Sequence, residues 1–438
     1  MFPKILKRVA LVFGVVALAG AAFSGSYFGP FATWQTQQLG YFGDDMGGPM
    51  NLGEEYRWNV KTIYYAYDPS FIQYFGIEGT NGIEKAIAIM NAIPNVSQMS
   101  TNLDEFPLDT KRVNHTASAL NLVDLKSFTL CNLINHLGVA PAERYIWCLR
   151  ARVPFPPSSA AFTNYTVIKR NFDPVTLQPS SYVNGVLYTY VIEDFTNPQY
   201  ADATEVPVDP LQIGFTTVAS GWEGFSGKLL TGEYYTGLTR EDMGTLRHLY
   251  GKANPLEHWH VETLPAGTTA QTTQTTGSPW SIPGGTNSTS TNSIIDQAIR
   301  PGVERIEFKQ AKFDSLLGAF IPVTNKWTDT YVSNGVYYTQ LVQRVVESPD
   351  ILFAAEDLDV DALGYPILFS RDTAAGWIDN DSINGSTVLS GPGVITGPIT
   401  FTYSKIGPYF VNVNPSFLDR SEEHTSELQS PYVISYAV

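Results

Sequence analysis

The spacing of apolar residues along the chain predicts three helices in the first 251 positions. Apolar side chains recur every three to four residues over about 81–93, about 122–137 and Thr239–Tyr250, and a glycine directly follows the last two segments. This period indicates amphipathic helices, and glycine is a common helix stop. In the second helix the predicted core stripe is Leu130, Leu133, Ile134 and Leu137.

Strands are predicted where β-branched and aromatic residues cluster. Val60–Tyr67 is such a run. Asn184-Gly185 and Asn334-Gly335 each separate two alternating runs, which is the strongest short-range signal for a hairpin. Val394–Phe401 and Phe410–Val413 have the composition of further strands. Helices and strands therefore occur together, and we expect an α+β fold.

Changes in composition divide the chain into segments. Residues 263–292 are rich in Thr, Ser, Gly and Gln, a composition that cannot bury enough apolar surface to fold alone. We predict an extended lead-in at 23–57, a first globular domain at 58–253 and a linker or loop at 254–297. A β-rich, sandwich-like and incomplete domain is expected at 298–419.

Both ends of the chain are set apart from the fold prediction. Lys4, Lys7 and Arg8 precede an apolar run that ends in small residues, which is typical of a secretory signal peptide over 1–22. An uncleaved anchor is the weaker alternative, because the apolar run Val9–Ala22 is shorter than the about 20 residues that a membrane span needs.

Residues 420–438 begin R-S-E-E-H-T-S-E-L-Q-S, which resembles the in-frame translation of a sequencing-library adapter. We expect this tail not to belong to the natural protein, and we expect a secreted or cell-envelope location.

The charge balance excludes some classes of partner. The chain has 27 Lys and Arg against 42 Asp and Glu, for a formal net charge of −15. Such an acidic chain lacks the electrostatic footprint of a protein that binds nucleic acid or anionic lipid. We expect no nucleic-acid partner and no membrane span after signal cleavage, which leaves a surface protein, a peptide or a polysaccharide as candidate partners.

Three stretches in a fixed order carry a family resemblance. Trp58–Pro94 combines a strand with a helix, T-L-C-N-L-I-N-H-L-G-V occupies 129–139, and L-T-R-E-D-M-G-T-L-R-H-L-Y-G occupies Leu238–Gly251. Together they resemble the opening strand and helix, the zinc helix and the closing helix of the matrixin-type metzincin metalloproteases. The resemblance covers about Trp58–Gly251 and implies a twisted sheet with two long helices and a closing helix.

The resemblance does not extend to the metal ligands. In the motif H-E-x-x-H two histidines bind zinc, the glutamate takes a proton from the metal-bound water, and a third ligand follows six residues later. Here these positions hold Cys131, Asn132, Asn135 and Pro141. An amide is a poor zinc ligand and cannot act as a base, and proline has no ligating side chain. We therefore expect a degenerate motif without catalytic residues, metal or cofactor, whose polar arc, including His136, faces the former cleft.

Other polar patterns are less specific. His258 and His260 alternate along the chain without a third ligand. Asp357, Asp359 and Asp361 suggest calcium, but the glycine and glutamate that an EF-hand loop needs at its sixth and twelfth positions are absent. Solvated loop charge is the simpler interpretation of these three aspartates.

The two cysteines leave an alternative open. Cys131 and Cys148 could form a disulfide in an oxidising compartment, or stay free because one of them lies inside a predicted helix. The adjacent Glu143-Arg144 is interpreted as a surface charge pair. No G-x-S-x-G elbow, phosphate loop or Cys-His nucleophile pair occurs in the sequence.

These observations predict an exported, multidomain, acidic pseudoenzyme of the metzincin-like class, with a binding or envelope-structural role. One alternative is an active secreted hydrolase, zinc-dependent or not, with an unrecognised site. Another is an extracellular scaffold whose aromatic-rich strands assemble with copies of itself. Metal analysis distinguishes the first two functions, and light scattering distinguishes the third.

Overall fold

The structure is a computed structural model of the 438-residue chain. It describes residues 25–42, 46–154, 163–173, 175–196, 199–211, 216–221, 229–252, 259–270, 294–358, 370–373, 375–379 and 392–405. The fold is mixed α+β with more strand than helix, which confirms the predicted class at that level. The predicted signal peptide, the strand expected at Phe410–Val413 and the adapter-like tail lie outside the described residues. In the described part, no helix combines the length and the apolar character that a bilayer span requires.

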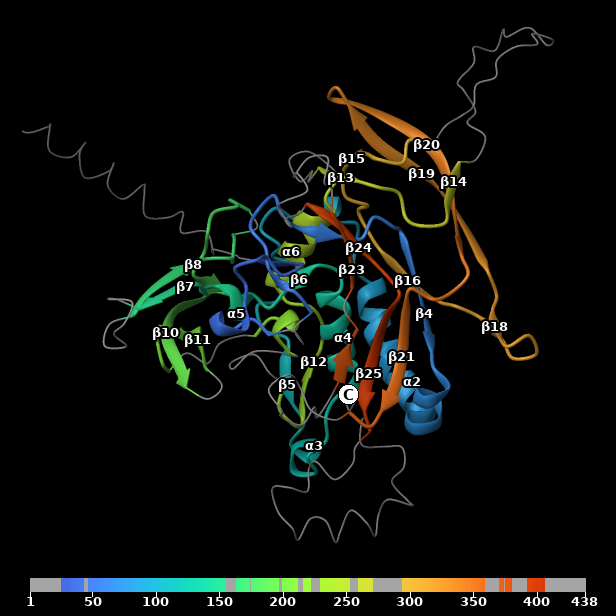
Figure 1. Cartoon of the computed structure of the whole chain (residues 1–438). Helices are drawn as coiled ribbons and strands as arrows, with labels where there is room; N and C mark the ends of the chain where they lie inside the picture. The colour runs from blue at the N-terminus through green and yellow to red at the C-terminus, as the bar shows by residue number, and fades with distance from the viewer. Residues whose placement is uncertain are drawn as a thin grey trace, which may run out of the picture.

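A five-stranded sheet forms the centre of the molecule (Figure 1). Four of its strands run parallel to their neighbours, and the fifth is an antiparallel edge strand. In spatial order they are β16 (Glu307–Gln310), β4 (Thr62–Tyr67), β21 (Ile351–Glu356), β25 (Ile399–Ser404) and the edge strand β22 (Ser370–Asp372). Most residues of β4, β21 and β25 are buried, as expected for parallel strands covered on both faces.

This sheet crosses the boundary predicted between the two domains. Strand β4 belongs to the predicted first domain, and its four sheet partners come from 298–419. The backbone N–H of Tyr64 donates to Oδ2 of Asp350 at 2.9 Å, across 286 positions of sequence. Ile63 and Phe71 share one buried core with Phe353. Strands of both predicted regions therefore contribute to the central sheet and to the core that packs against it.

Helix α2 (Pro69–Asn91) begins earlier than the predicted helix at 81–93. The side chain of Asp68 accepts a hydrogen bond from the N–H of Ser70 at 2.8 Å, and Pro69 occupies the first helical turn. Both features favour a helix start, so the Asp-Pro pair caps a helix as well as ending a strand. Gly76 has φ 60° and ψ −155°, which divides the helix into two segments, and the prediction captured only part of the second.

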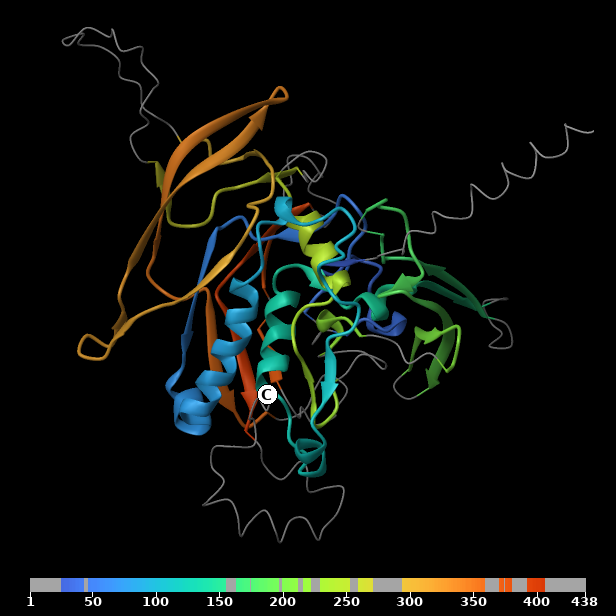
Figure 2. The same cartoon turned by 180° about the vertical axis from the view of Figure 1, so that it is seen from behind.

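Helix α4 (Leu125–Asn135) carries the degenerate motif and packs beside α2 on one face of the central sheet (Figure 2). The side chain of Asp124 accepts from the N–H of Ser127, which sets the helix start inside the predicted 122–137. The remaining helices are α3 (His115–Ala119), α5 (Ala142–Tyr145) and α6 (Arg240–Tyr250). The side chain of Thr239 forms a capping box with Asp242 at the start of α6.

A second, antiparallel sheet contains the longest hairpin of the described residues. Its turn is Asn334-Gly335, with φ of 51° and 74°, so the predicted hairpin is confirmed. In spatial order the strands are β13 (His260–Glu262), β15 (Ala298–Arg300), β19 (Val323–Ser333), β20 (Val336–Val346) and β14 (Thr268–Ala270). The hairpin extends away from the central sheet (Figure 1).

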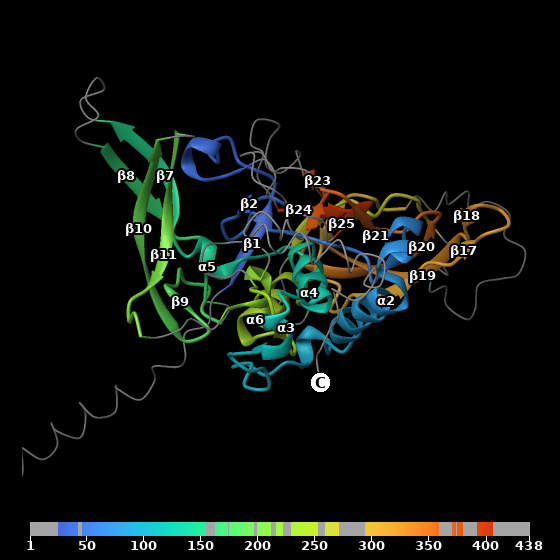
Figure 3. The same cartoon turned by 90° about the horizontal axis from the view of Figure 1, so that it is seen from below.

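On the opposite side of the molecule, further strands form another lobe (Figure 3). The lobe contains β7 (Cys148–Pro154), β8 (Thr163–Ile168), β9 (Tyr182–Val183), β10 (Val186–Thr196) and β11 (Gln199–Pro207). Its turn Asn184-Gly185 has φ of 44° and 84°, which confirms the second predicted hairpin.

Short strands complete the fold. The strand predicted at Val394–Phe401 is interrupted at Gly397-Pro398, so β24 and β25 are separate strands. The short strands are β1 (Ser26–Gly29), β2 (Gly48–Pro49), β3 (Tyr56–Arg57), β5 (Lys111–Val113), β6 (Val139–Ala140), β12 (Glu233–Tyr235), β17 (Phe313–Asp314), β18 (Ala319–Phe320), β23 (Gly376–Asp379) and β24 (Gly393–Thr396). Three short 3-10 helices, η1 (Gln37–Leu39), η2 (Val96–Gln98) and η3 (Val218–Ser220), lie between them.

Candidate functional site

Helix α4 buries both its apolar and its polar face. The predicted core stripe is confirmed, because all four of its side chains are at most 4% exposed. The polar arc is buried as well: Cys131 is 0%, Asn132 1% and Asn135 6% exposed. The expectation that this arc faces an open cleft is therefore corrected. The turn η3 covers one part of it, and strand β22 covers another.

Two motif residues bind each other and the turn. The thiol of Cys131 lies 3.5 Å from Oδ1 of Asn135 and 3.6 Å from the carbonyl oxygen of Ala219. Nδ2 of Asn135 donates to the carbonyl oxygens of Val139 at 2.9 Å and Ala219 at 3.0 Å. Pro141, at the position of the third ligand, caps α5 and is buried. The residues at the ligand positions thus join α4 to neighbouring backbone.

The histidine that follows the motif forms a buried polar contact with the edge strand. Nδ1 of His136 lies 2.9 Å from the carbonyl oxygen of Asn132 and 3.7 Å from Oδ2 of Asp372, and Nδ2 of Asn132 donates to Oδ1 of Asp372 at 3.2 Å. Burial lowers the pKa of His136 to about 4 and raises the pKa of Asp372 well above its usual range. Both directions favour the uncharged forms, and we therefore interpret the contact as a neutral pair.

The turn η3 is held by two buried carboxylates that the sequence did not identify. Glu143 accepts from the N–H of Thr217 at 2.7 Å. Asp242, on α6, accepts from the N–H groups of Val218 and Ala219, each at 3.1 Å. Burial raises the pKa of both carboxyls, and these hydrogen bonds oppose the rise. The turn has neither strand nor helix periodicity, so its sequence carries no signal of this role.

The interpretation of Glu143-Arg144 as a surface charge pair is wrong. Glu143 is 1% exposed and points to the turn, where the hydroxyl groups of Thr217 and Ser220 also donate to its Oε2. Arg144 pairs instead with Asp202, with Nη2 and Oδ2 2.6 Å apart. Glu143 therefore binds the turn η3, whereas the adjacent Arg144 forms an ion pair with Asp202.

Both cysteines are free thiols, so the disulfide alternative is not realised in the structure. Cys131 lies beneath the turn η3, whereas Cys148 begins β7 and packs with Phe28, Tyr41 and Tyr145. Burial raises the pKa of the Cys148 thiol to about 12, which opposes formation of a reactive thiolate.

The donor set around α4 does not suit a zinc ion. Across the described residues, no group of three or more His, Cys, Asp or Glu side chains lies close enough to hold a metal ion. The neighbours of Cys131 are an amide and a carbonyl group, and His136 contacts one uncharged carboxyl. A zinc site needs three or four such donors around one point.

The other predicted candidates lie only partly within the described residues. His260 is buried on β13, with Nδ1 3.6 Å from Oε1 of Glu262, and His258 lies outside the described residues. Asp357 follows β21 near the end of a described stretch, and Asp359 and Asp361 lie beyond it. Each of these two groupings thus includes residues outside the described part of the chain.

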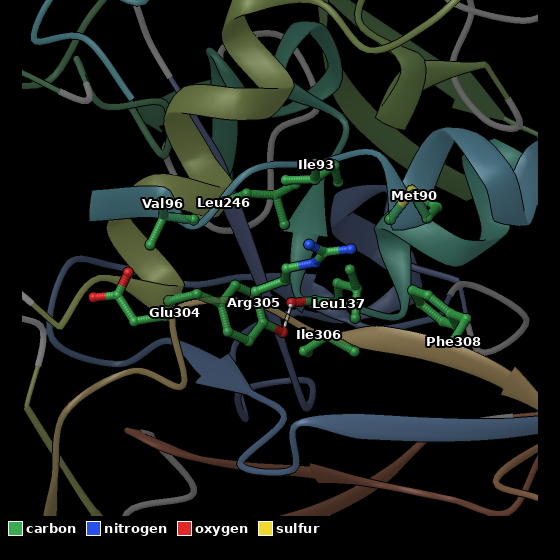
Figure 4. Close-up of a pocket in the computed structure, with 10 residues that line it drawn as sticks. Met90, Ile93, Val96, Leu137, Leu246, Glu304, Arg305, Ile306 and Phe308 are labelled. Carbon is green, nitrogen blue, oxygen red and sulfur yellow. Dashed lines mark hydrogen bonds between the residues drawn. The ribbon is translucent and has the colours of Figure 1, made fainter. Parts of the chain in front are cut away.

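Two neighbouring cavities share Glu304 and Arg305 in their walls. The first lies between the ends of α2, α4 and α6 and the strand β16, and has an apolar lining (Figure 4). Tyr250 lines this cavity and donates to the carbonyl oxygen of Leu137 at 2.7 Å. Its volume of about 20 Å³ fits about one water molecule. The second cavity has a mixed polar and apolar wall and measures about 310 Å³, a size that suits a small ligand.

Comparison of the chain with protein-family models, with curated proteins and with solved structures gives no match. The assignment of a function therefore rests on the geometry of these sites.

Proposed function

We propose that the protein is a non-catalytic, metzincin-like binding protein that is exported and acts as a secreted or envelope component. The fold supports the proposal: α2 and α4 cover one face of the central sheet, and α6 follows them along the chain. The order of these helices agrees with the matrixin resemblance, whereas four of the five central strands come from beyond residue 251.

The observation that carries the proposal is the internal use of the degenerate motif. Cys131 and Asn135 both direct polar atoms at the carbonyl oxygen of Ala219, and Asn132 binds the edge strand through Asp372. A buried donor or acceptor without a partner costs about 1–3 kcal/mol. Opening this region for a metal and its water would break these contacts, so the substituted motif stabilises the fold at the expense of a metal site.

The first experiment measures metal content and proteolysis together. Purified full-length protein is analysed by inductively coupled plasma mass spectrometry and incubated with casein and gelatin. We expect well under one equivalent of zinc and no cleavage, because the donors are missing. Stoichiometric zinc that is lost in Cys131→Ala but kept in the matched control Cys148→Ala would overturn the proposal in favour of the hydrolase alternative.

One observation favours the scaffold alternative as a second candidate. Strand β20 exposes apolar side chains along the long hairpin, including Tyr337 at 44% and Tyr338 at 46% exposure. Exposed apolar strands are surfaces on which a second copy can pair. Light scattering between about 1 and 100 µM distinguishes the two roles: a constant monomer mass refutes the scaffold function, and a mass that grows with concentration supports it.

A further inference from the structure

The cavity of about 310 Å³ lies where three parts of the fold meet. Lys61 lines it from the residue before β4, and Lys252 lines it from the chain just after α6. Trp327 and Asp329 contribute from β19 of the second sheet. Its wall thus depends on the docking of the second sheet against the central part of the fold.

The carboxylates deepest in this wall already have cationic partners. Asp329 accepts from Nε of Arg300 at 3.1 Å and from Nε2 of Gln340 at 2.8 Å. Glu262 accepts from Nε of Arg57 at 2.8 Å, and both side chains of this pair are 1% exposed. Both carboxylates are thus engaged by arginines, and Asp329 adds only a longer-range attraction to Lys61. Glu304, the third carboxylate of the wall, accepts from the N–H of Ser97 at 3.1 Å.

Two lysines in the same wall lack such neutralisation. Nζ of Lys252 donates to the neutral hydroxyl group of Thr330 at 3.2 Å. In the described part of the chain, Lys61 forms no ion pair. Burial lowers the pKa of Lys61, the positive charge of Lys252 lowers it further, and the negative charge of Asp329 opposes this in part. The two ammonium groups therefore repel each other. A bound anion would relieve that repulsion.

The uncharged residues of the wall indicate which chemical group of the ligand lies beside its anionic group. Trp327 is half-buried and offers an indole ring, while Asn95 and Thr328 offer an exposed amide and hydroxyl group. An aromatic surface beside hydrogen-bonding groups suits a ligand with one flat apolar face and polar edges. A sugar ring has this character, since its C–H groups form a face and its hydroxyl groups project at the rim.

We propose that this cavity binds an acidic saccharide unit, with the carboxylate of the sugar between Lys61 and Lys252 and its ring against Trp327. The inference deepens the proposed binding role and rests on it. The net charge of −15 means that the field of the whole chain does not attract anions, so affinity depends on the short-range lysine contacts. Added salt should weaken binding, because these lysines are partly exposed to solvent.

Isothermal titration calorimetry of the full-length protein with digalacturonate tests the site. Loss of one charge-assisted contact corresponds to about a tenfold to hundredfold weaker Kd, so Lys61→Met and Lys252→Met should each weaken binding by that factor. Trp327→Ala should also weaken it. Lys326→Met is the matched control, because Lys326 adjoins Trp327 on β19 but lies outside the cavity wall. Thermal melting confirms that each variant folds.

The outcomes are distinct. Binding of digalacturonate at least tenfold tighter than neutral lactose, lost in both cavity-lysine variants and kept in Lys326→Met, supports the inference. Equal binding of lactose overturns the role of the lysines. Sulfate that binds as tightly as digalacturonate, with no effect of Trp327→Ala, overturns the sugar assignment, and absence of any binding overturns the site. These results are independent of the zinc measurement, so the site can fail while the proposed non-catalytic function stands.

Discussion

Replacing His136 with glutamine should make the stability of the protein less sensitive to acid. His136 is 1% exposed, and burial lowers its pKa from 6.5 to about 4. In the unfolded chain the imidazole is solvated and keeps its ordinary pKa. As the pH falls below 6.5, the unfolded state therefore binds a proton that the folded state does not bind, and the free energy of unfolding decreases.

The magnitude follows from the difference between the two pKa values. About 2.5 pKa units, at about 1.4 kcal/mol per unit, correspond to roughly 3 kcal/mol of lost stability once the pH is below about 4. Most of this loss, about 2 kcal/mol, should be present at pH 4.5, and almost none at pH 7. The raised pKa of Asp372 acts in the opposite direction, because the folded carboxyl binds a proton that the unfolded carboxylate does not, but this contribution is common to wild type and His136→Gln.

The assay is urea unfolding followed by circular dichroism, at pH 7 and pH 4.5. Other groups titrate in both proteins, so the pH-dependent difference between wild type and His136→Gln isolates one imidazole. Between the two pH values the wild type should lose about 2 kcal/mol more than the variant. His115→Gln serves as control, because His115 is exposed at the start of α3. Equal losses in wild type and His136→Gln would mean that the folded protein protonates His136, and the neutral-pair interpretation would be wrong.

Three further predictions concern packing. Gly138→Ala should lower the free energy of unfolding by more than about 1 kcal/mol in thermal melts, because φ is +96° and the new Cβ would lie 2.3 Å from a backbone oxygen of β3; an unchanged melting temperature would contradict this geometry. Cys131 and Cys148 should resist a thiol reagent such as dithionitrobenzoate in the folded state and react after unfolding, since both are at most 1% exposed; rapid native labelling of either would contradict their burial. Glu262→Gln should cost about 3–5 kcal/mol in chemical denaturation, because it leaves the guanidinium group of Arg57 buried without a counter-charge; a loss below about 1 kcal/mol would show that water reaches this pair.

Features encoded in short stretches could be predicted from the sequence. The turns at Asn184-Gly185 and Asn334-Gly335 need positive φ at both positions, which these residue types tolerate, so the two hairpins were identified. The core stripe of α4 also follows from local spacing. The start of α2 was missed because Gly76 interrupts the helix, so the segment before it lacks a continuous helical period.

Features that depend on distant residues could not be predicted. Parallel pairing between β4 and β21 leaves no mark in either strand, so the shared central sheet had no sequence signal. The burial of Glu143 depends on the turn η3, which lies 74 positions away. The sequence likewise predicted that the polar arc of α4 faces a cleft. The elements that cover this arc come from residues 217–220 and 370–373, far from α4 in the sequence.

The central sheet also sets the order in which the chain can complete its fold during synthesis. Strand β4 and helix α2 are made early, but their sheet neighbours lie beyond residue 306, and the contact between Tyr64 and Asp350 spans 286 positions. Contacts at such separation carry a large loop-closure cost and slow folding. Until those strands emerge, β4 has unpaired edges and the sheet-facing side of α2 stays uncovered, which is the state most prone to aggregation. A fragment that ends near Tyr250 contains only one of the five central strands, so it should behave as an incompletely folded chain.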